Sequence, residues 1–311
     1  MKTRIYIDGQ VGTTGLQIYD RIGNRDDLEL LRIEEEKRHD SAARKKFLNS
    51  ADIVFLCLPD EGAREAVALI ENPSVRVIDA STAHRTDEGW TYGFPELSKT
   101  QRSAIAAGKR IANPGCHATG FLSCAAPLVA MGILPRDYPL GCYSLTGYSG
   151  GGKKMIAEYS SAERKASLSA AGIYSLGLRH KHLPEMQKYS GLDFPPVFHP
   201  VVDDFIQGMA TSILLQNRLL PGAPCAEQIC EKMAEYYRDE YFVRVRPFEA
   251  VPGTLYANQL AGTNYLELIV CGNETQTSIT ALFDNLGKGA SGAAVQNMNI
   301  MLGLPENTGL E

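Results

Sequence analysis

One cysteine lies in a local sequence that suits nucleophilic chemistry. Cys116 follows a turn-forming segment, Asn113 to Gly115, and precedes a long apolar stretch up to Met131 that we predict to be a helix. Amide groups and the macrodipole at a helix N-terminus stabilise a thiolate and make it nucleophilic near neutral pH. The other cysteines lack this setting; Cys124, for example, falls inside the same predicted helix, where a buried apolar role is expected. The sequence therefore predicts that Cys116 is a nucleophile.

Residues 179–185 carry a second group of reactive side chains. Two imidazoles, two cations and a carboxylate occur there: Arg179, His180, Lys181, His182 and Glu185. An imidazole could pass a proton to a developing alkoxide, the cations could hold a carboxylate or a phosphate, and Glu185 could orient His182. Two other interpretations stay open. The imidazoles and Glu185 could bind a metal ion, although no further ligand cluster accompanies them, or the segment could be a solvated basic turn.

A glycine-rich turn connects the first predicted strand to the first predicted helix. Its residues are Gly9, Gly12, Thr13, Thr14 and Gly15, with the glycines spaced GxxGxxG rather than in the commoner GxGxxG pattern. Backbone amides at such a helix N-terminus could bind the pyrophosphate of a dinucleotide. The alternative is a plain turn that needs positive φ at one or two glycines.

Charges of both signs follow the second predicted strand, where the adenosine ribose of a dinucleotide would lie. Glu34 to Glu36 could hold a ribose 2′-hydroxyl, whereas Arg32, Lys37 or Arg38 could hold a 2′-phosphate. For each single charge, a solvated surface loop is the alternative. The residues alone therefore leave NAD and NADP open.

Another loop of small residues spans 147–154, between a predicted strand and a predicted helix. It contains Ser149, Gly150 and Gly151 beside two lysines. Backbone amides in such a loop could cradle an anionic part of the substrate. A plain flexible connection is the alternative.

The elements that must position these groups form two series. Through residue 115, short apolar strands alternate with helical patterns, which predicts parallel βαβ units of the Rossmann type. These elements are expected over residues 4–7, 14–22, 28–33, 42–48, 53–58, 63–70, 75–78 and 110–112. Longer strands follow, over residues 141–146, 197–202, 205–216, 265–271 and 275–283. The last two suit an antiparallel hairpin, so the second series predicts an α+β domain with a mixed or antiparallel sheet.

Two domains follow from this change of pattern. We predict a dinucleotide-binding domain over residues 1–115 and a catalytic, substrate-binding and oligomerisation domain over residues 116–286. The last predicted helix, residues 290–302, is apolar on several sides. We therefore expect the segment from about 287 to 311 to pack back against the first domain and complete it.

Composition narrows the class of protein and its partners. The net charge is −5, without a long basic run, which disfavours nucleic acid as a partner. The longest apolar run, residues 121–134, is too short to span a bilayer, and no export signal is visible at the N-terminus. Seven cysteines without CxxC pairs fit a reducing compartment, so we expect a cytoplasmic enzyme with a small-molecule substrate.

Motifs that resemble those of one enzyme family occur from one end of the chain to the other. They occupy residues 9–15, 55–59, 77–81, 92–96, 113–116, 147–153, 180–185 and 284–289. On these motifs the whole chain resembles the short form of the N-acetyl-γ-glutamyl-phosphate reductases. This arginine-biosynthetic family is related in architecture to aspartate-semialdehyde and glyceraldehyde-3-phosphate dehydrogenases, so the resemblance implies a semialdehyde dehydrogenase-like fold.

The resemblance also implies roles for particular residues. It makes Cys116 the nucleophile and His182 the acid/base group, with His180 beside it, and NADP the cofactor. The further cofactor contacts that it implies are Pro59, Ser81, Asn285, Gly289, Ser291 and Gly292. Two departures from the family pattern occur: a histidine replaces the usual tyrosine at position 117, and a lysine replaces an arginine at position 181. Lysine cannot form the paired hydrogen bonds that arginine makes with a carboxylate or a phosphate. A substrate-binding role for Lys181, beside Arg179, is therefore less specific than it would be for an arginine.

The expected reaction is the reduction of N-acetyl-γ-glutamyl phosphate by NADPH through a Cys116 thioester. It would release phosphate and N-acetyl-glutamate semialdehyde, without a metal ion. A related reductase acting on aspartyl or aminoadipyl phosphate is one alternative, and a non-catalytic dinucleotide sensor is another. By analogy with related enzymes, we expect a homo-oligomer, either a tetramer or a dimer.

Overall fold

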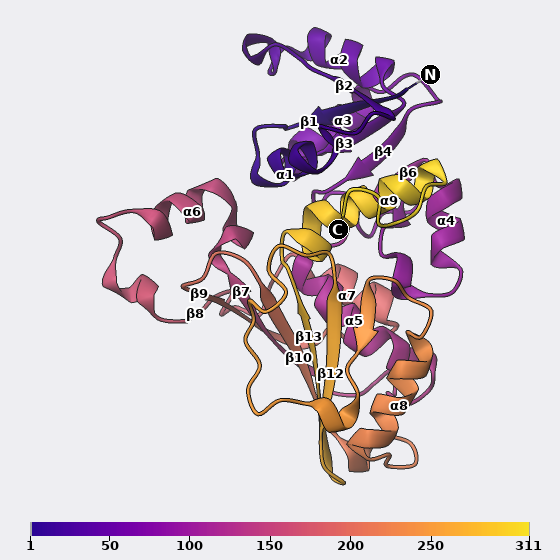
Figure 1. Ribbon diagram of the computed structural model, residues 1–311, viewed down its shortest axis with the longest axis vertical. Coiled ribbons are helices and arrows are strands. Elements are labelled where there is room, and N and C mark those ends of the chain that lie inside the picture. Colours follow the sequence, from indigo (N-terminus) through magenta and orange to yellow (C-terminus); the bar gives the residue numbers. More distant parts are fainter. Residues whose placement is uncertain (1, 311) are drawn as a thin grey trace. The chain divides into compact units, whose positions relative to one another are not determined.

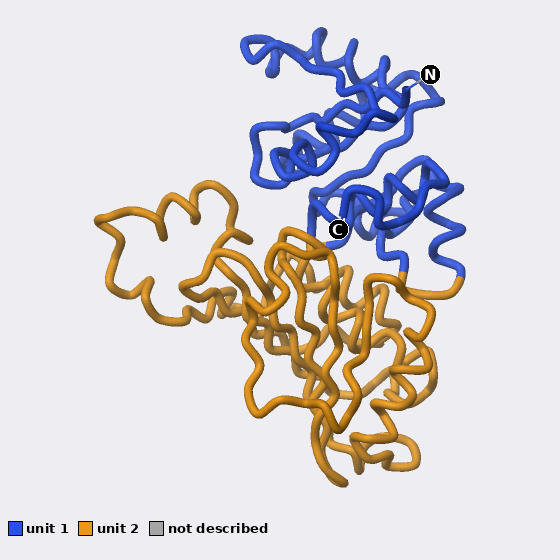
Figure 2. Tube along the Cα trace, viewed as in Figure 1, with its two compact units in different colours: residues 1–95, 100–114, 290–311 blue, residues 96–99, 115–289 orange. Residues whose placement is uncertain are grey.

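The computed structural model describes residues 2–310, which form two compact units (Figure 2). Unit 1 comprises Met1–Pro95, Thr100–Pro114 and Ala290–Glu311, and unit 2 comprises Glu96–Lys99 and Gly115–Gly289. The main boundary between the units falls between Pro114 and Gly115. Residues 96–99, which lie within the predicted first domain, belong to unit 2.

Unit 1 is built on a six-stranded parallel sheet in the order β2-β1-β3-β4-β6-β5 (Figure 1). The predicted Rossmann-type pattern is confirmed. The central strand β3 is wholly apolar and wholly buried, as expected for a parallel strand covered on both faces. The strands are β1 (Thr3–Asp8), β2 (Leu28–Leu31), β3 (Ile53–Leu56), β4 (Arg76–Asp79), β5 (Thr91–Tyr92) and β6 (Arg110–Ala112).

Among residues 2–310, five α-helices belong to this unit. They are α1 (Thr13–Ile22), α2 (Ser41–Ser50), α3 (Asp60–Leu69), α4 (Gln101–Ala107) and α9 (Gly292–Leu302). The terminal helix α9 contacts α4, α1 and β4. Two hydrogen bonds hold it there: Asn297 Nδ2 donates to the carbonyl of Gly93 at 2.9 Å, and Arg25 Nη1 donates to Asn299 Oδ1 at 2.7 Å.

Unit 2 contains a seven-stranded mixed sheet in the order β11-β12-β13-β10-β7-β9-β8. The pairs β7–β9 and β11–β12 are parallel and the other neighbours are antiparallel. The predicted hairpin is β12–β13, paired up to Gly272 and Thr277. The strands are β7 (Gly141–Gly147), β8 (Gly172–Ile173), β9 (Val197–Asp203), β10 (Met209–Gln216), β11 (Val243–Val245), β12 (Leu266–Gly272) and β13 (Gln276–Phe283).

Unit 2 also contains the helices α5 (Cys116–Ala130), α6 (Gly152–Ser160), α7 (Leu183–Ser190) and α8 (Ala226–Tyr236). Of these, α5 and α8 pack directly on the sheet (Figure 1). Helix α5 packs on β10, β13 and α7, and α8 packs on β12. Buried and exposed side chains alternate along the second half of β10. Thr211, Ile213 and Leu215 are buried, and Leu214 and Gln216 are exposed. The period of two shows that the other face of the sheet is open along this strand.

One predicted strand was too long. The strand expected over residues 205–216 begins only at Met209, because residues 203–208 turn back on themselves. In this turn the N–H of Phe205 donates to the carbonyl of Asp203 at 2.8 Å. The carbonyls of Phe205 and Ile206 then accept from the amides of Tyr148 and Ser149, at 2.9 and 3.1 Å.

Several short elements were not predicted from the sequence, because two to five residues are too few to show a repeating pattern of apolar side chains. Besides β5, β8 and β11, these include helical turns at Glu35–Lys37, Pro95–Leu97, Tyr148–Gly151, Ala166–Ser169, Asn217–Leu219 and Phe248–Ala250, and a π-helical turn at Gly287–Ser291. Of the helices seen between residues 2 and 310, none combines the length and apolar character that a membrane crossing requires.

Candidate active site

The glycine loop of unit 1 is shaped by close backbone contacts. Gly9 has φ +87°, and a Cβ atom there would lie 2.3 Å from the carbonyl oxygen of Cys57. A Cβ at Gly15 would lie 2.6 Å from the carbonyl oxygen of Gly9. Side chains at either position would therefore displace the loop from the N-terminus of α1, which begins at Thr13.

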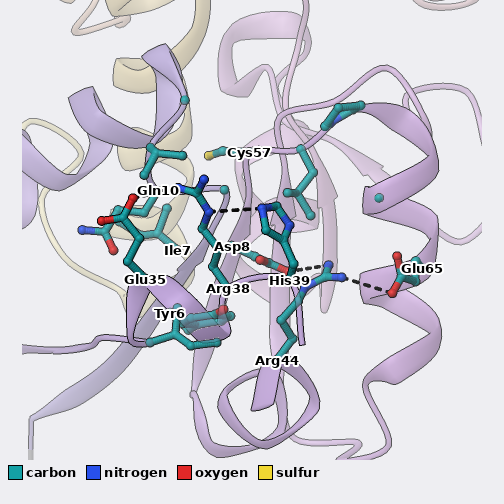
Figure 3. Close-up of a pocket in the computed structure, with 17 residues that line it drawn as sticks. Tyr6, Ile7, Asp8, Gln10, Glu35, Arg38, His39, Arg44, Cys57 and Glu65 are labelled. Atoms are coloured by element: carbon teal, nitrogen blue, oxygen red, sulfur yellow. Dashed lines mark hydrogen bonds and ion pairs between the residues drawn. The ribbon is translucent and has the colours of Figure 1, made fainter. Parts of the chain in front are cut away.

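A cavity of about 600 Å³ opens beside this loop (Figure 3). Of the predicted cofactor contacts, Gly9, Gly12, Arg38 and Pro59 line it. His39, which the sequence did not single out, lines it too. The cavity lies at the carboxyl ends of β1 and β3, where ligands of open parallel sheets bind.

Arg32 and Arg38 have different places in the structure. Arg38 lines the cavity, where its guanidinium donates to Glu35 Oε1 at 3.1 Å and to His39 Nε2 at 3.1 Å. Arg32 is not among the lining residues; its guanidinium bonds to the hydroxyl of Tyr19 and lies over that ring, 5.2 Å from the centroid. The structure thus separates two cations that the sequence treated alike.

A buried ion pair forms one wall of the cavity, and sequence analysis missed it. Arg44 donates to Asp8 Oδ2 at 2.9 Å and to Glu65 Oε1 at 3.1 Å (Figure 3). Burial raises the pKa of the Asp8 carboxyl, and the guanidinium of Arg44 opposes that shift. Because Arg44 compensates the charge of Asp8, the carboxylate would repel a phosphate in the cavity less strongly. The only local signal was the position of Asp8 at the end of the first strand.

Ser81, another predicted cofactor contact, bonds to its own loop. Its hydroxyl donates to Asp79 Oδ2 at 2.8 Å, and its N–H donates to Asp79 Oδ1 at 2.9 Å. The same carboxylate bonds His84 Nδ1 at 2.6 Å, and the imidazole stacks on Trp90. Asp79 therefore orders the loop after β4.

The nucleophile predicted from the sequence is the first residue of α5, in unit 2. Cys116 is partly exposed, and Gly115 is the N-cap residue of the helix. The buried carboxylate of Glu185, from the first turn of α7, accepts a hydrogen bond from the N–H of Gly115 at 3.1 Å. Glu185 therefore holds the backbone turn in front of Cys116; the expected pairing with His182 stays a prediction.

The predicted cofactor contacts between residues 285 and 292 have different surroundings in the structure. A Cβ at Gly289 would lie 2.9 Å from the Cβ of Cys116, so this glycine leaves space beside the nucleophile. Asn285 Nδ2 donates to Ser149 Oγ at 3.0 Å, and its Oδ1 accepts from the N–H of Gly208 at 2.9 Å. Gly292 begins α9 in unit 1, where Ser291 Oγ donates to Gln17 Oε1 at 2.9 Å.

Three imidazoles cluster in unit 2. The ring centroids of His180 and His182 are 4.7 Å apart, and that of His117 lies 5.4 and 5.6 Å from them. His180 Nδ1 accepts a hydrogen bond from the N–H of His182 at 3.1 Å. A neutral His180 therefore carries its proton on Nε2. His182 is buried, whereas Arg179 and Lys181 are exposed.

His117 belongs to the site, although the sequence marked it only as a departure from the family pattern. Its Nδ1 bonds Ser144 Oγ and its Nε2 bonds the Tyr174 hydroxyl, each at 2.7 Å. Ser144 Oγ in turn bonds Thr211 Oγ1 at 2.7 Å. Burial, together with the charges of His180 and Lys181, lowers the pKa of His117 to about 3. Its imidazole is neutral at any physiological pH.

The loop at residues 147–151 offers fewer free amides than expected. The amides of Tyr148 and Ser149 donate to the carbonyls of the 205–206 turn, and that of Gly152 donates to Ser149. Gly150 and Gly151 are exposed, and Ser149 is buried. Any anion cradle in this loop is therefore limited to the two exposed glycines.

The alternative metal site is not formed. Within the described residues 2–310, no three histidine, cysteine, aspartate or glutamate side chains are grouped so as to hold a metal ion. The carboxylate of Glu185, one of the ligands considered for that site, accepts a hydrogen bond from the N–H of Gly115.

Comparison with known families matches both units. Residues 9–105 match the family described as "Semialdehyde dehydrogenase, NAD binding domain", and residues 116–285 match "Semialdehyde dehydrogenase, dimerisation domain". Among solved structures, aspartate semialdehyde dehydrogenase II from Vibrio cholerae has a TM-score of 0.73 at 15% identity, covering 97% of this chain and 98% of that one. The enzyme from Candida albicans, solved with NADP, has a TM-score of 0.66 at 14% identity, covering 97% and 99%. At such identities these structures show the fold alone.

Several relatives of higher identity are named N-acetyl-gamma-glutamyl-phosphate reductases. An N-acetyl-gamma-glutamyl-phosphate reductase 2 from Nostoc is 50% identical over 99% of this chain and 99% of its own length. The N-acetyl-gamma-glutamyl-phosphate reductases of Chelativorans and Brucella ovis are 48% and 46% identical over 97% of this chain, and over 99% and 100% of their own lengths. The similarity extends over both units, so the chain belongs to the N-acetyl-γ-glutamyl-phosphate reductase family, within the semialdehyde dehydrogenase fold.

Proposed function

We propose that this chain reduces N-acetyl-γ-glutamyl phosphate to N-acetyl-glutamate 5-semialdehyde with NADPH and releases phosphate, as a step of arginine biosynthesis. The observation that carries this proposal is the placement of Cys116 at the N-terminus of α5, beside Gly289 and in the same unit as the imidazoles of His180 and His182. The names of the relatives supply the substrate.

Cys116 would perform the covalent step. Its thiolate, stabilised by the amides of the first turn of α5, attacks the acyl carbon of the substrate. The carbon–oxygen bond to the phosphoryl group breaks, phosphate leaves, and a thioester remains on Cys116. Gly289 supports this step because no side chain crowds the nucleophile from that side. Glu185 supports it by fixing the N–H of Gly115 and with it the start of the helix.

His182 would handle the proton. When bound, the nicotinamide cofactor supplies the hydride that reduces the thioester. His182 then protonates the hemithioacetal oxygen. As the hemithioacetal collapses to the aldehyde, His182 takes this proton back, and Cys116 is released as the thiolate. The backbone N–H of His182 holds His180 with its proton on Nε2, so His180 can donate a hydrogen bond to substrate but cannot accept one at Nδ1.

Two cations are available for the negative charges of the substrate. Arg179 and Lys181 are exposed on the segment that leads to His182. The charge of Lys181 contributes to the lowered pKa of His117, so it acts electrostatically on the interior of the site. We assign these two side chains to the carboxylate or the phosphate of the substrate, with Gly150 and Gly151 as further amide donors.

The cavity of unit 1 fits the adenosine half of a dinucleotide. Gly9 and Gly12 would place backbone amides against the pyrophosphate at the start of α1. Arg38 and His39, which share the cavity, would hold a 2′-phosphate, and Arg44 compensates Asp8 nearby. These contacts favour NADP over NAD.

The open face of the unit 2 sheet suits a second copy of the chain. Leu214, Gly141 and Val197 lie in one row across three neighbouring strands, and Tyr143 lies on the same face. Leu214, Val197 and Tyr143 are 61%, 58% and 45% exposed. Such an apolar patch on a domain of the dimerisation family supports a homo-oligomer. All seven cysteines are free thiols, which suits a reducing compartment such as the cytoplasm.

The experiment that tests this function runs the reaction in reverse. Reduction of NADP and of NAD by N-acetyl-glutamate semialdehyde is followed at the nicotinamide absorbance, with and without phosphate, for wild type and Cys116→Ala. Turnover that needs phosphate and is lost in the variant supports the reaction, the substrate and the nucleophile. Faster turnover of the shorter or longer semialdehyde would identify that compound as the substrate instead. Pocket length and recognition of the amide group should discriminate strongly between the three semialdehydes. A folded protein that turns over none of the three would instead be a dinucleotide sensor.

A further inference from the structure

We propose that the buried ion pair between Glu96 and Lys288 positions the backbone of Gly289 against the side chain of Cys116, and so sets the space in which the nucleophile reacts. Glu96 and Lys288 are positioning residues, because they act on the nucleophile through Gly289. This inference rests on the proposed function, since it concerns the surroundings of the proposed nucleophile. All four residues belong to unit 2.

The first step is the ion pair itself. Lys288 Nζ donates to both carboxylate oxygens of Glu96, at 2.8 Å each. The side chains of Lys288 and Glu96 are 1% and 0% exposed, and the ammonium lies 5.6 Å from the ring centroid of the buried Phe242. Two charges so far from water are a weak source of stability, because their attraction must first offset the lost hydration. They do fix where their two ends lie, because separating them leaves a charge in the interior.

The second step is the support on which Glu96 stands. Residues 96–99 belong to unit 2, although the chain on both sides of them belongs to unit 1. Tyr236, the last residue of α8, donates its hydroxyl proton to the carbonyl of Leu97 at 3.0 Å. Lys99 Nζ donates to the carbonyl of Tyr236 at 3.2 Å. The end of α8 therefore holds the segment that carries the carboxylate.

The third step is the turn that carries the ammonium. Lys288 lies in the π-helical turn Gly287–Ser291. Single π turns are rare and are found frequently at functional sites. Asp284 holds the start of this turn: its Oδ1 accepts from the N–H of Gly287 and its carbonyl accepts from the N–H of Gly289, each at 3.0 Å. The side chain of Lys288 adds another fixed point to the turn, through the ion pair.

The fourth step links this turn to the nucleophile. A Cβ atom at Gly289 would lie 2.9 Å from the Cβ of Cys116, 3.1 Å from the carbonyl oxygen of Asp284 and 3.3 Å from the ring of Phe283. The backbone of Gly289 thus packs against Cys116 with no room for a methyl group. Lys288 precedes Gly289 directly, so a displacement of Lys288 changes the space beside Cys116. Small misplacements of reacting groups are costly in rate, so the ion pair acts on the chemistry.

The test measures the space around Cys116 without turnover. Iodoacetamide and the bulkier N-ethylmaleimide are reacted separately with the protein, and alkylation of the Cys116 peptide is followed by mass spectrometry. Both reagents react with the same thiolate. The ratio of the N-ethylmaleimide rate to the iodoacetamide rate therefore cancels the ionised fraction of Cys116 and reports steric access to its sulfur.

The main variant is the double substitution Glu96→Gln/Lys288→Met, which removes both charges and nearly keeps both side-chain lengths. Lys288→Met alone removes only the ammonium. The matched control is Arg246→Met/Glu267→Gln, because Arg246 Nε donates to Glu267 Oε1 at 3.0 Å in another ion pair of unit 2, at the β11–β12 edge of the sheet. Gly289→Ala shows how the ratio responds when a methyl group is added beside Cys116.

We expect Lys288→Met to lower Tm by roughly 5–10 °C, because a buried carboxylate loses its ammonium. The double variant should recover most of this loss, since both charges are gone. Its alkylation ratio should nevertheless rise by about threefold or more, because Gly289 relaxes away from the sulfur, and kcat should fall roughly tenfold at an unchanged KM. Gly289→Ala should lower the ratio instead. The Arg246/Glu267 control should keep the ratio and the kcat of the wild type.

A folded double variant with the alkylation ratio and the kcat of the wild type would overturn the inference, because the ion pair could then be replaced without effect on the site. An equal rise of the ratio in the Arg246/Glu267 control would overturn it too. If the double variant does not fold, Glu96→Asp decides the matter. It keeps both charges and shortens the reach by one methylene, so an unchanged ratio would contradict the proposal.

Failure of the proposed function looks different. The wild type would then turn over none of the three semialdehydes, whereas the alkylation ratio of Cys116 would still depend on Glu96 and Lys288.

Discussion

The carboxylate of Glu185 accepts a hydrogen bond from the backbone N–H of Gly115, 3.1 Å away, and thereby ties the first turn of α7 to the residue before the nucleophile. The two residues are 70 positions apart, and both are buried. The start of α5 is thus held by a neighbouring helix as well as by its own hydrogen bonds.

We expect Glu185→Ala to impair both stability and turnover. It leaves the buried N–H of Gly115 without this acceptor, which should cost about 1–3 kcal/mol of unfolding free energy. The loosened helix start should lower kcat by roughly tenfold, because a small misplacement of a reacting group is costly. Glu185→Gln keeps an amide oxygen as acceptor and should retain more of both quantities. Urea unfolding and steady-state kinetics measure them. Equal losses in the two variants would mean that the charge of Glu185, rather than this hydrogen bond, is what the site needs.

Gly9 and Gly89 form a matched pair for the dinucleotide loop. Both have positive φ, +87° and +82°, but a Cβ at Gly9 would meet the Cys57 carbonyl at 2.3 Å, whereas nothing lies within 4 Å of one at Gly89. Each change to alanine should cost about 1 kcal/mol from backbone strain alone. Only Gly9→Ala should weaken NADPH binding, by at least tenfold in a fluorescence titration. If both variants bind NADPH like wild type, the glycine loop is not the pyrophosphate site.

Arg38 should decide the choice between NADPH and NADH. Removing a hydrogen bond to a charged group costs about 1.5–3 kcal/mol, so Arg38→Met should lower kcat/KM with NADPH by roughly tenfold to a hundredfold. The value with NADH should change little, because NADH has no 2′-phosphate. Arg32→Met serves as the control, since the Arg32 guanidinium lies over Tyr19 rather than along the cavity. If kcat/KM with NADPH fell only in Arg32→Met, the contact with the 2′-phosphate would belong to Arg32 instead.

His117 should make the protein sensitive to acid. Its pKa is about 3 in the folded chain and near 6.5 when unfolded, so the unfolded state binds more protons between these values. Stability from this group is present above pH 6.5 and is lost as the pH falls toward 3, by up to about 5 kcal/mol. The free energy of unfolding of the wild type should therefore fall more steeply between pH 7 and 4.5 than that of His117→Gln. Parallel curves for the two proteins would show that His117 titrates normally.

The apolar sheet face should hold the oligomer together. Leu214→Asp places a charge in the exposed row that it shares with Val197, and should dissociate the oligomer in light scattering behind size exclusion. Phe194→Asp is the control, because Phe194 is similarly exposed, at 67%, but lies outside the strands. Dissociation by the control alone would move the interface away from the sheet.

The sequence by itself determined the features that neighbouring residues encode. Alternation of short apolar runs with helical patterns predicted the parallel sheet of unit 1, and the apolar-polar period on either side of residues 272–274 predicted the β12–β13 hairpin. The turn before Cys116, followed by a long apolar run, predicted a helix that begins at the cysteine. These are local signals, because a period or a turn is set by residues close together in the chain.

The tertiary structure decided which side chains meet. His117, Ser144, Tyr174 and Thr211 form one hydrogen-bonded chain only because the sheet places β7 next to β10 and because α5 packs on that sheet. In the same way, the fold puts Arg38 beside the cavity and turns Arg32 toward Tyr19. Such contacts join residues tens of positions apart. A local sequence pattern cannot predict these contacts. They depend on the order and register of the strands, which are set only when the whole chain packs.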